Sequence, residues 1–272
     1  VATPLFFLNG FIICHLNVGH TMWANAFLLP WMILLYLNIP NQGINWRWVL
    51  SFSLFSLVLL LQGGYHFALW SWAFFLFCGL FKINSLKTVL VSILFSILTS
   101  MLRILPASIT FYDNDRRFIA GFRSLNDLVQ SLIQLQLPEE AQALMNSGLP
   151  NWETNFFIGL GGGLFLLFFA IIIPIQQKEK GNWFTPLWIP LIIFSVLSMG
   201  QVFRFTNLLP FGLAHAERVS SRFFFIPLLY LIVIAGDTFN QWWQGKKGTF
   251  PAWAILLSAE VILLHDLIQN AR

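Results

Sequence analysis

The sequence predicts an all-α integral membrane protein, a polytopic bundle of transmembrane helices. Apolar residues make up 57% of the 272 residues and charged residues only 10%, against roughly 45–50% and about 25% in soluble domains. The apolar residues form continuous runs about as long as a bilayer-spanning helix, roughly 20 residues. The runs lack the alternation of a transmembrane β-barrel. Because only helices and closed barrels satisfy their backbone groups in lipid, helices are predicted.

We expect about nine apolar segments, which form a single transmembrane domain over residues 1–272. They cover approximately residues 4–14, 22–37, 49–62, 65–81, 86–105, 155–175, 185–203, 220–237 and 252–268. The first, third and fourth are short for a full crossing, and such segments often form broken helices that line a cavity. Gly63 and Gly64 would break or turn the chain. The alternative is one long tilted helix across residues 49–81.

The lysines indicate the orientation. With nine crossings, all six lysines fall on one face, and the positive-inside rule makes that face cytoplasmic. The opposite, outer face collects the histidines, most of the acids and the loop 106–153. In this loop we expect an amphipathic helix at about residues 124–137, lying on the membrane surface. Its apolar residues recur at helical spacing, and Ser124 and Asp127 fit a capping box.

The outer loop also contains a D-x-D pattern, formed by Asp113 and Asp115. Two carboxylates one residue apart can share a divalent metal, which can in turn hold a diphosphate. The same pattern is common in solvated turns, where nearby arginines would pair with the acids. Asp113 and Asp115 are therefore candidate metal ligands, and a divalent metal is the one cofactor that the sequence suggests.

Arginines follow one another closely in this region, at Arg103, Arg116, Arg117 and Arg123. Guanidinium groups bind phosphate in a bidentate fork and stay charged at any working pH. They suit the diphosphate of a lipid-linked donor at the bilayer surface. The alternative is contact with lipid headgroups and pairing with acids. Arg116, Arg117 and Arg123 are candidate substrate-binding residues.

Histidines lie in two of the outer turns. His15 and His20 are spaced H-x4-H, but no cysteine or glutamate at matching spacing completes a zinc site. Hydrogen bonding to a ligand or to other loops fits this pair better. His66 follows the predicted break at Gly63 and Gly64. His20 and His66 are candidate pocket-lining residues.

A charged cluster borders the eighth apolar segment and contains Glu217, Arg218 and Arg222. Ionisable groups beside a membrane helix are unfavourable unless they are paired or wet, so they indicate function. The alternative is a structural salt bridge of Glu217 with Arg218 or Arg222, which anchors the end of the helix. Glu217 joins Asp113 and Asp115 as a candidate catalytic residue, and both arginines are candidate substrate-binding residues.

Several outer-face stretches carry a resemblance to a known family. They are Asn9-Gly10-Phe11, Gly19-His20, Leu29-Pro30-Trp31, Gly63-Gly64-Tyr65-His66, Trp152-Glu153-Thr154-Asn155-Phe156-Phe157-Ile158-Gly159 and Glu217-Arg218-Val219-Ser220-Ser221-Arg222-Phe223. In this order they resemble segments of YfhO-type bacterial membrane proteins, which belong to the GT-C glycosyltransferase superfamily. Ser220 stands where proline is usual. The resemblance covers most of the chain.

The resemblance implies transfer of a sugar from a polyprenyl-phosphate donor on the outer face of a bacterial inner (plasma) membrane. It also implies that an acid in the first outer loop acts as base. Under this hypothesis the arginines would hold the donor phosphate, and His20 and His66 would line the pocket. No such acidic loop precedes Leu5. We therefore expect that an N-terminal part is missing, or that one of the three candidate carboxylates replaces the base.

Two other functions fit the composition. The chain could be a non-catalytic subunit of an electron-transfer or light-harvesting complex, with a Phe-rich surface that packs against other membrane subunits and histidines that ligate pigments. It could also be a transporter with broken helices at residues 4–14 and 49–81. The expected partners are the lipid bilayer, a lipid-linked sugar donor and, for the complex, those subunits. Nucleic acid is excluded, because no basic patch interleaved with aromatics stands out.

Overall fold

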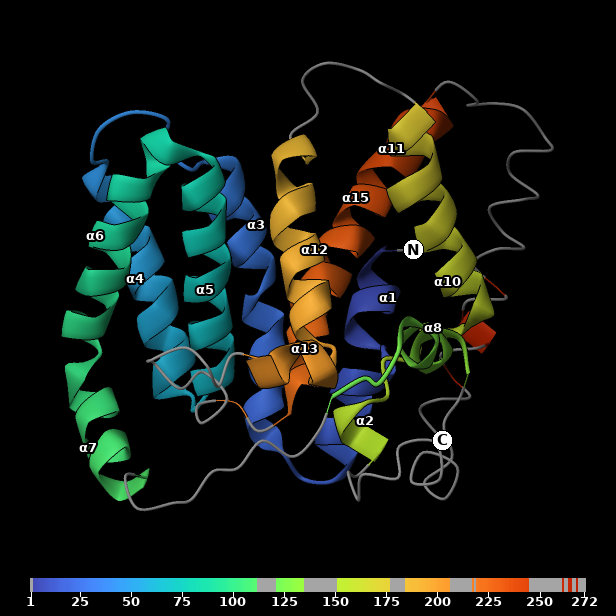
Figure 1. The fold of residues 1–272 in the computed structure, drawn as a ribbon, viewed down its shortest axis with the longest axis horizontal. Helices are drawn as coiled ribbons and strands as arrows, with labels where there is room; N and C mark the ends of the chain where they lie inside the picture. Colours follow the sequence, from blue (N-terminus) through green and yellow to red (C-terminus); the bar gives the residue numbers. More distant parts are fainter. Residues whose placement is uncertain are drawn as a thin grey trace. The chain divides into compact units, whose positions relative to one another are not determined.

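The computed structural model shows a helical protein (Figure 1). It describes residues 2–111, 121–134, 151–176, 184–205, 217 and 219–244, with positions 261, 264, 265 and 268. Within these residues there is no β-strand, and an isolated β-bridge joins Phe122 and Met199. The prediction of an all-α protein is therefore confirmed for the part of the chain that the structure describes.

The contacts divide the chain into two compact units. Unit 1 combines Val1–His20, Arg117–Gly181 and Ser195–Arg272. Unit 2 combines Thr21–Arg116 and Asn182–Phe194. Each unit is thus assembled from stretches that are distant in the sequence.

Unit 2 opens with a 3-10 helix, η1 (Thr21–Leu28), and the α-helix α3 (Pro30–Leu37). Pro30 stands at the start of α3, where its missing N–H has no helical partner to lose. The next helix, α4 (Trp46–Leu61), is capped by Asn45, whose side chain accepts a hydrogen bond from Trp48 N at 3.2 Å. The segment predicted at 22–37 thus consists of η1 and α3, two short helices of different pitch.

A tight turn at Gly63 separates α4 from α5 (Tyr65–Phe81). Gly63 has a φ of 84°, which glycine adopts without the steric cost that a Cβ would impose. The amides of Gly63 and Gly64 bond back to the carbonyls of Leu60 and Leu59, so the turn satisfies the end of α4. The predicted break is confirmed, and the alternative of one helix across residues 49–81 is wrong.

The third long helix of unit 2, α6 (Ile83–Thr99), packs against both α4 and α5, as Figure 1 shows. Small hydroxyl residues line its contact with α4: Ser96 Oγ lies 3.3 Å from Ser53 Oγ. Small side chains let helices approach closely in a membrane. At Ser100 the chain bends by 71° into α7 (Met101–Phe111).

The remaining helices of unit 2 begin with a 3-10 turn, η4 (Thr185–Leu187), which leads into α12 (Trp188–Leu197). The ring of Phe194 in α12 lies 5.9 Å from that of Phe74 in α5, in an edge-on arrangement. The boundary between the units falls within α12, directly after Phe194.

Unit 1 begins with two short helices, α1 (Ala2–Phe7) and α2 (Gly10–Asn17). Asn9 separates them, because its side chain accepts a hydrogen bond from Ile12 N and caps α2. The short apolar segment predicted at 4–14 is thus a broken helix. Both parts contribute to the core, where Leu5 and Phe11 are fully buried.

The two longest helices that the structure describes in unit 1 pack against each other. One runs over Gly159–Gln176 and is built from α10 (Gly159–Leu166), a π-helical stretch η3 (Leu167–Ile172) and α11 (Ile173–Gln176). The other runs over Ser220–Gln244 and is built from a 3-10 turn η6 (Ser220–Phe224) and α15 (Phe225–Gln244). Phe169 and Phe239 meet edge-on between them, with ring centroids 5.1 Å apart.

The predicted amphipathic helix is present as α8 (Leu125–Ile133) in unit 1. Ser124 Oγ accepts a hydrogen bond from Asp127 N, as the capping box predicts, while the Asp127 carboxylate accepts from Arg123 N. The helix ends at Ile133, since Gln134 is extended. The rest of the predicted stretch, residues 135–137, lies outside the described residues.

In the described part of the chain, two helices are long and apolar enough to cross a membrane: Gly159–Gln176 and Ser220–Gln244. A third crossing is added if the bent pair Ile83–Thr99 and Met101–Ala107 forms one broken span. These helices fit an integral membrane protein. The segment predicted at 252–268 lies almost wholly outside the described residues.

Candidate functional site

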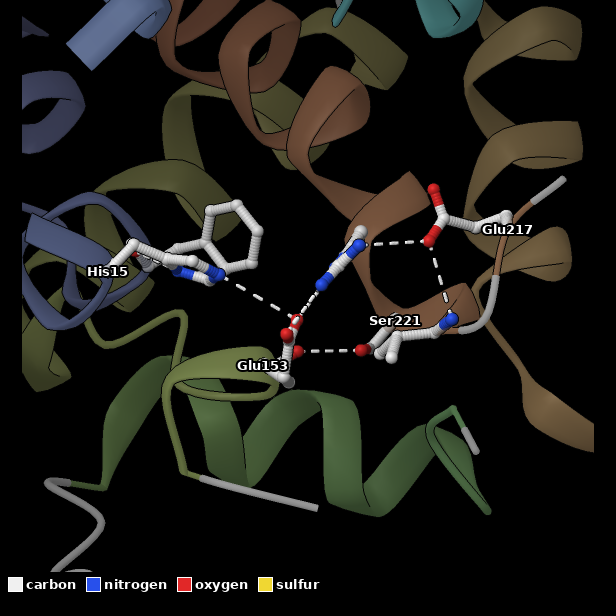
Figure 2. Close-up of polar contacts among 7 residues, drawn as sticks. His15, Glu153, Glu217 and Ser221 are labelled. Atoms are coloured by element: carbon white, nitrogen blue, oxygen red, sulfur yellow. Dashed lines mark hydrogen bonds and ion pairs between the residues drawn. The ribbon is translucent and has the colours of Figure 1, made fainter. Parts of the chain in front are cut away.

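A cluster of buried charged side chains lies in unit 1, where three segments meet (Figure 2). Glu153 comes from a 3-10 turn, η2 (Asn151–Glu153), and Arg222 comes from η6. Glu217 precedes η6, and His15 lies near the end of α2. Glu153 is 6% exposed, Glu217 5% and His15 0%. Burial of this many ionisable groups is rare unless they pair with one another.

Arg222 joins the two carboxylates. Its Nε and Nη2 donate to the two oxygens of Glu153 at 2.6 and 2.5 Å, and its Nη1 donates to Glu217 Oε1 at 3.1 Å. The fork on Glu153 is the bidentate geometry in which guanidinium and carboxylate interact most strongly. The salt bridge between Glu217 and Arg222, expected as the structural alternative, is therefore present, and it is extended by Glu153.

His15 approaches the same cluster from α2. Its Nδ1 lies 2.8 Å from the carbonyl oxygen of Phe11, and its Nε2 lies 3.7 Å from Glu153 Oε2. Since a carbonyl can only accept, Nδ1 carries the hydrogen of this bond. The distance to Glu153 is longer than a hydrogen bond, so this contact is electrostatic.

The surroundings set the charge state of Glu153 and His15. Burial alone would raise the pKa of Glu153, but His15 and the hydrogen bonds and charge of Arg222 outweigh it and hold the pKa at about 2. Burial lowers the pKa of His15 below the ordinary histidine value, and the neighbouring Glu153 only partly offsets this effect. At neutral pH the cluster therefore contains two carboxylates, one guanidinium and a neutral imidazole.

Four further contacts hold the segments that carry the cluster. Ser221 Oγ donates to the carbonyl oxygen of Glu153 at 2.6 Å, and Glu217 Oε1 accepts from Val219 N at 3.3 Å. Gly10 N donates to Phe157 O at 2.8 Å, and Phe11 stacks on Phe156 with ring centroids 4.5 Å apart. The chain after Glu153 is thus held against α2 on one side and η6 on the other.

Gly10 is required at this contact. A Cβ at this position would lie 2.8 Å from Phe157 N and would overlap the Asn155 side chain. We expect Gly10→Ala to lower the free energy of unfolding by about 1–3 kcal/mol, as overpacking does. Thermal unfolding in detergent micelles would measure this loss. Asn17→Ala, at the exposed end of the same helix, serves as the control and should unfold like the wild type; equal stability of both variants would contradict the contact.

A second, aromatic group of residues lies in unit 2, at the predicted glycine break. His66 stacks on Trp23 with an interplanar angle of 5° and ring centroids 6.2 Å apart, and it also contacts Trp70 at 5.7 Å. Asn25 Nδ2 donates to Gln62 O in the same turn, at 3.2 Å. His66 is half-buried, and its imidazole lies beside two indole rings.

The predicted site residues are only partly described. His20 is half-buried in unit 1, with its ring 5.6 Å from His15 and 5.9 Å from Trp152. Arg123 is exposed before α8, and Arg222 and Glu217 belong to the buried cluster. The others lie outside the described residues: Asp113, Asp115, Arg116, Arg117 and Arg218.

Sequence reasoning missed Glu153 as a site residue and assigned His15 no role in a charge cluster. Glu153 is 69 positions from Arg222, so nothing local in the sequence links the two. A signal was available: Glu153 lies two residues before the apolar segment predicted at 155–175, and an acid at such a boundary is unfavourable unless it is paired or wet.

No grouping of three or more histidine, cysteine, aspartate or glutamate side chains suited to a metal ion occurs among the described residues. His15, Glu153 and Glu217 are instead organised around a guanidinium. The candidate metal ligands Asp113 and Asp115 lie in residues 112–120, outside this description.

Comparison of the chain with protein-family models, with curated proteins and with solved structures finds no match.

Proposed function

We propose that the chain is a GT-C-like membrane glycosyltransferase that moves a sugar from a polyprenyl-phosphate donor on the outer face of a bacterial inner membrane. In this proposal the nine apolar segments form a multi-pass bundle, and the lysine-bearing loops face the cytoplasm. The outer end of the bundle then contains the charged cluster, the outer loop and the two histidine-bearing turns.

One observation carries the proposal: stretches that resemble the family, though distant in the sequence, meet in unit 1. Gly10 bonds to Phe157, Ser221 bonds to the backbone of Glu153, and Arg222 pairs with the Glu153 side chain. Separate motifs that converge on one buried charged cluster favour a shared site over independent surface features.

Within this proposal, Glu217 is the candidate base that the structure describes. Its carboxylate is oriented by Arg222 and by Val219 N, and a general base must be positioned in this way to take the proton of an acceptor hydroxyl. Arg218 and Arg222 are the proposed ligands of the donor phosphate. Two carboxylates already bind Arg222, so in this proposal a donor phosphate shares the guanidinium with Glu153 and Glu217.

The pigment-binding alternative is less well supported by the same geometry. His15 is fully buried, and its two ring nitrogens are directed at Phe11 O and at Glu153. A histidine that ligates a pigment metal needs an unprotonated nitrogen directed at that metal. Among the outer histidines that the structure describes, His15 is therefore a poor pigment ligand.

The proposal is tested by transfer assays on membranes that contain the full-length protein, with polyprenyl-phosphate-linked hexoses as donors. We expect Glu217→Gln to lower the transfer rate by about 100-fold or more, the usual contribution of a general base. Arg218→Ala should also abolish transfer. Arg47→Gln, an exposed residue in unit 2, is the control and should retain the wild-type rate.

The folded state of each variant is checked by its thermal unfolding in detergent. Unchanged transfer by a folded Glu217→Gln variant would contradict its role as base. A wild-type protein that transfers no hexose but co-purifies with other membrane subunits would contradict the transferase proposal and favour the non-catalytic subunit.

A further inference from the structure

One carboxylate oxygen lies between two possible donors. Glu153 Oε2 accepts from Arg222 Nε at 2.6 Å, and the same oxygen faces His15 Nε2 at 3.7 Å. Figure 2 shows His15 and Glu153 directed at each other from their two segments. Any strengthening of the contact with His15 therefore acts on the atom that Arg222 Nε binds.

The tautomer of His15 makes this contact sensitive to protonation. Its Nδ1 donates to Phe11 O at 2.8 Å, so in the neutral ring Nε2 has no hydrogen and presents its lone pair. A lone pair and a carboxylate oxygen are both acceptors, so they do not attract each other. A second proton, placed on Nε2, turns the same contact into a charge-assisted hydrogen bond.

The charges around His15 favour uptake of that proton, while burial opposes it. Among the residues that the structure describes, the titratable groups that face it are Glu153 from η2, Arg222 from η6 and His20 from the turn that follows α2. Glu217 lies beyond Arg222. With His15 neutral, the two carboxylates exceed the one guanidinium by one negative charge. Protonation of His15 balances these named side chains, so the proton is bound once the solution is acidic enough to offset burial.

We propose that His15 and Glu153 form a buried proton-binding site, in which a proton taken up at His15 Nε2 draws Glu153 Oε2 away from Arg222 Nε. Arg222 then keeps its bonds to Glu153 Oε1 and Glu217 but is held less firmly. Acid thereby loosens the contact between η2 and η6. The inference holds whether or not the chain transfers sugar.

Histidine-selective ¹⁵N NMR on the full chain in detergent micelles tests the site, with the His15 signal assigned from His15→Gln. At pH 7.5 we expect the hydrogen on Nδ1, and on acidification a second proton on Nε2. In Glu153→Gln the midpoint of this titration should fall by about one pH unit or more, because the anion that stabilises the imidazolium is gone. The His66 signal, in unit 2, is the internal control and should not move.

Two outcomes would overturn the site: a neutral wild-type His15 with its hydrogen on Nε2, or a midpoint that is unchanged in Glu153→Gln. The first does not need Glu153→Gln, so the test survives if that variant does not fold. The loosening is tested separately by amide exchange of residues 219–222 at one acidic pH, below the His15 midpoint. We expect exchange at least about fivefold faster in the wild type than in His15→Gln; equal rates would contradict the link to Arg222.

Discussion

Arg222→Ala is expected to lower the free energy of unfolding by about 3–5 kcal/mol, the usual result of removing one partner from a buried ion pair. The variant leaves Glu153 and Glu217 both buried, at 6% and 5% exposure, without the guanidinium that joins them. Two uncompensated carboxylates in a low-dielectric site repel each other and lose their solvation. Thermal or SDS-induced unfolding in detergent micelles would measure the loss.

The matched variants separate charge from geometry. Arg222→Lys keeps the positive charge but cannot form the bidentate fork, so its stability should lie between those of the wild type and Arg222→Ala. Arg47→Ala removes an exposed arginine from unit 2 and should change stability by less than about 0.5 kcal/mol. A loss below about 1 kcal/mol in Arg222→Ala would show that the cluster is not buried as described.

The second large effect concerns Glu153 and acid. Its pKa is held at about 2, below the value of 4.5 of an unperturbed glutamate. Because the folded state holds the carboxylate in its ionised form, this stabilisation is complete above pH 4.5 and is lost as the pH falls from 4.5 to 2. The shift corresponds to about 3 kcal/mol. We therefore expect the wild-type protein to lose stability steeply across this interval.

Glu153→Gln removes the titrating group and should flatten the response to acid between pH 4.5 and 2. Unfolding of the two proteins, measured at intervals of half a pH unit, compares the slopes directly. Asp127→Asn, which removes a carboxylate from α8 in the same unit, is the control and should keep the wild-type slope. Parallel curves for Glu153→Gln and the wild type would contradict a strongly paired Glu153.

Local features of the fold could be predicted from the sequence, because their causes lie within a few residues. Ser124 and Asp127 mark the start of α8 by a contact over three positions. Gly63 ends α4 because its positive φ closes a turn within the same short stretch. A broken helix was expected at residues 4–14, but its break was not placed at Asn9, although the cap of Asn9 on Ile12 is equally local.

The site could be predicted only in part, for the same physical reason. The salt bridge of Glu217 with Arg222 spans five positions and could be anticipated. The bidentate pair of Glu153 with Arg222 spans 69 positions and depends on how η2 and η6 pack. Hydrophobic periodicity places helices but does not specify which of their ends meet, so the residue with the strongest contact to Arg222 was overlooked.

A double-mutant cycle between Glu153→Gln and Arg222→Ala tests most directly whether this pair holds η2 and η6 together. The free energy of unfolding is measured for the wild type, both single variants and the double variant in the same detergent at pH 7. Arg222→Ala leaves the buried Glu153 carboxylate without its partner, and Glu153→Gln removes that charge. The double variant should therefore lose less stability than the sum of the two single losses. We predict a coupling of about 1–3 kcal/mol; effects that add within about 0.5 kcal/mol would contradict the buried cluster.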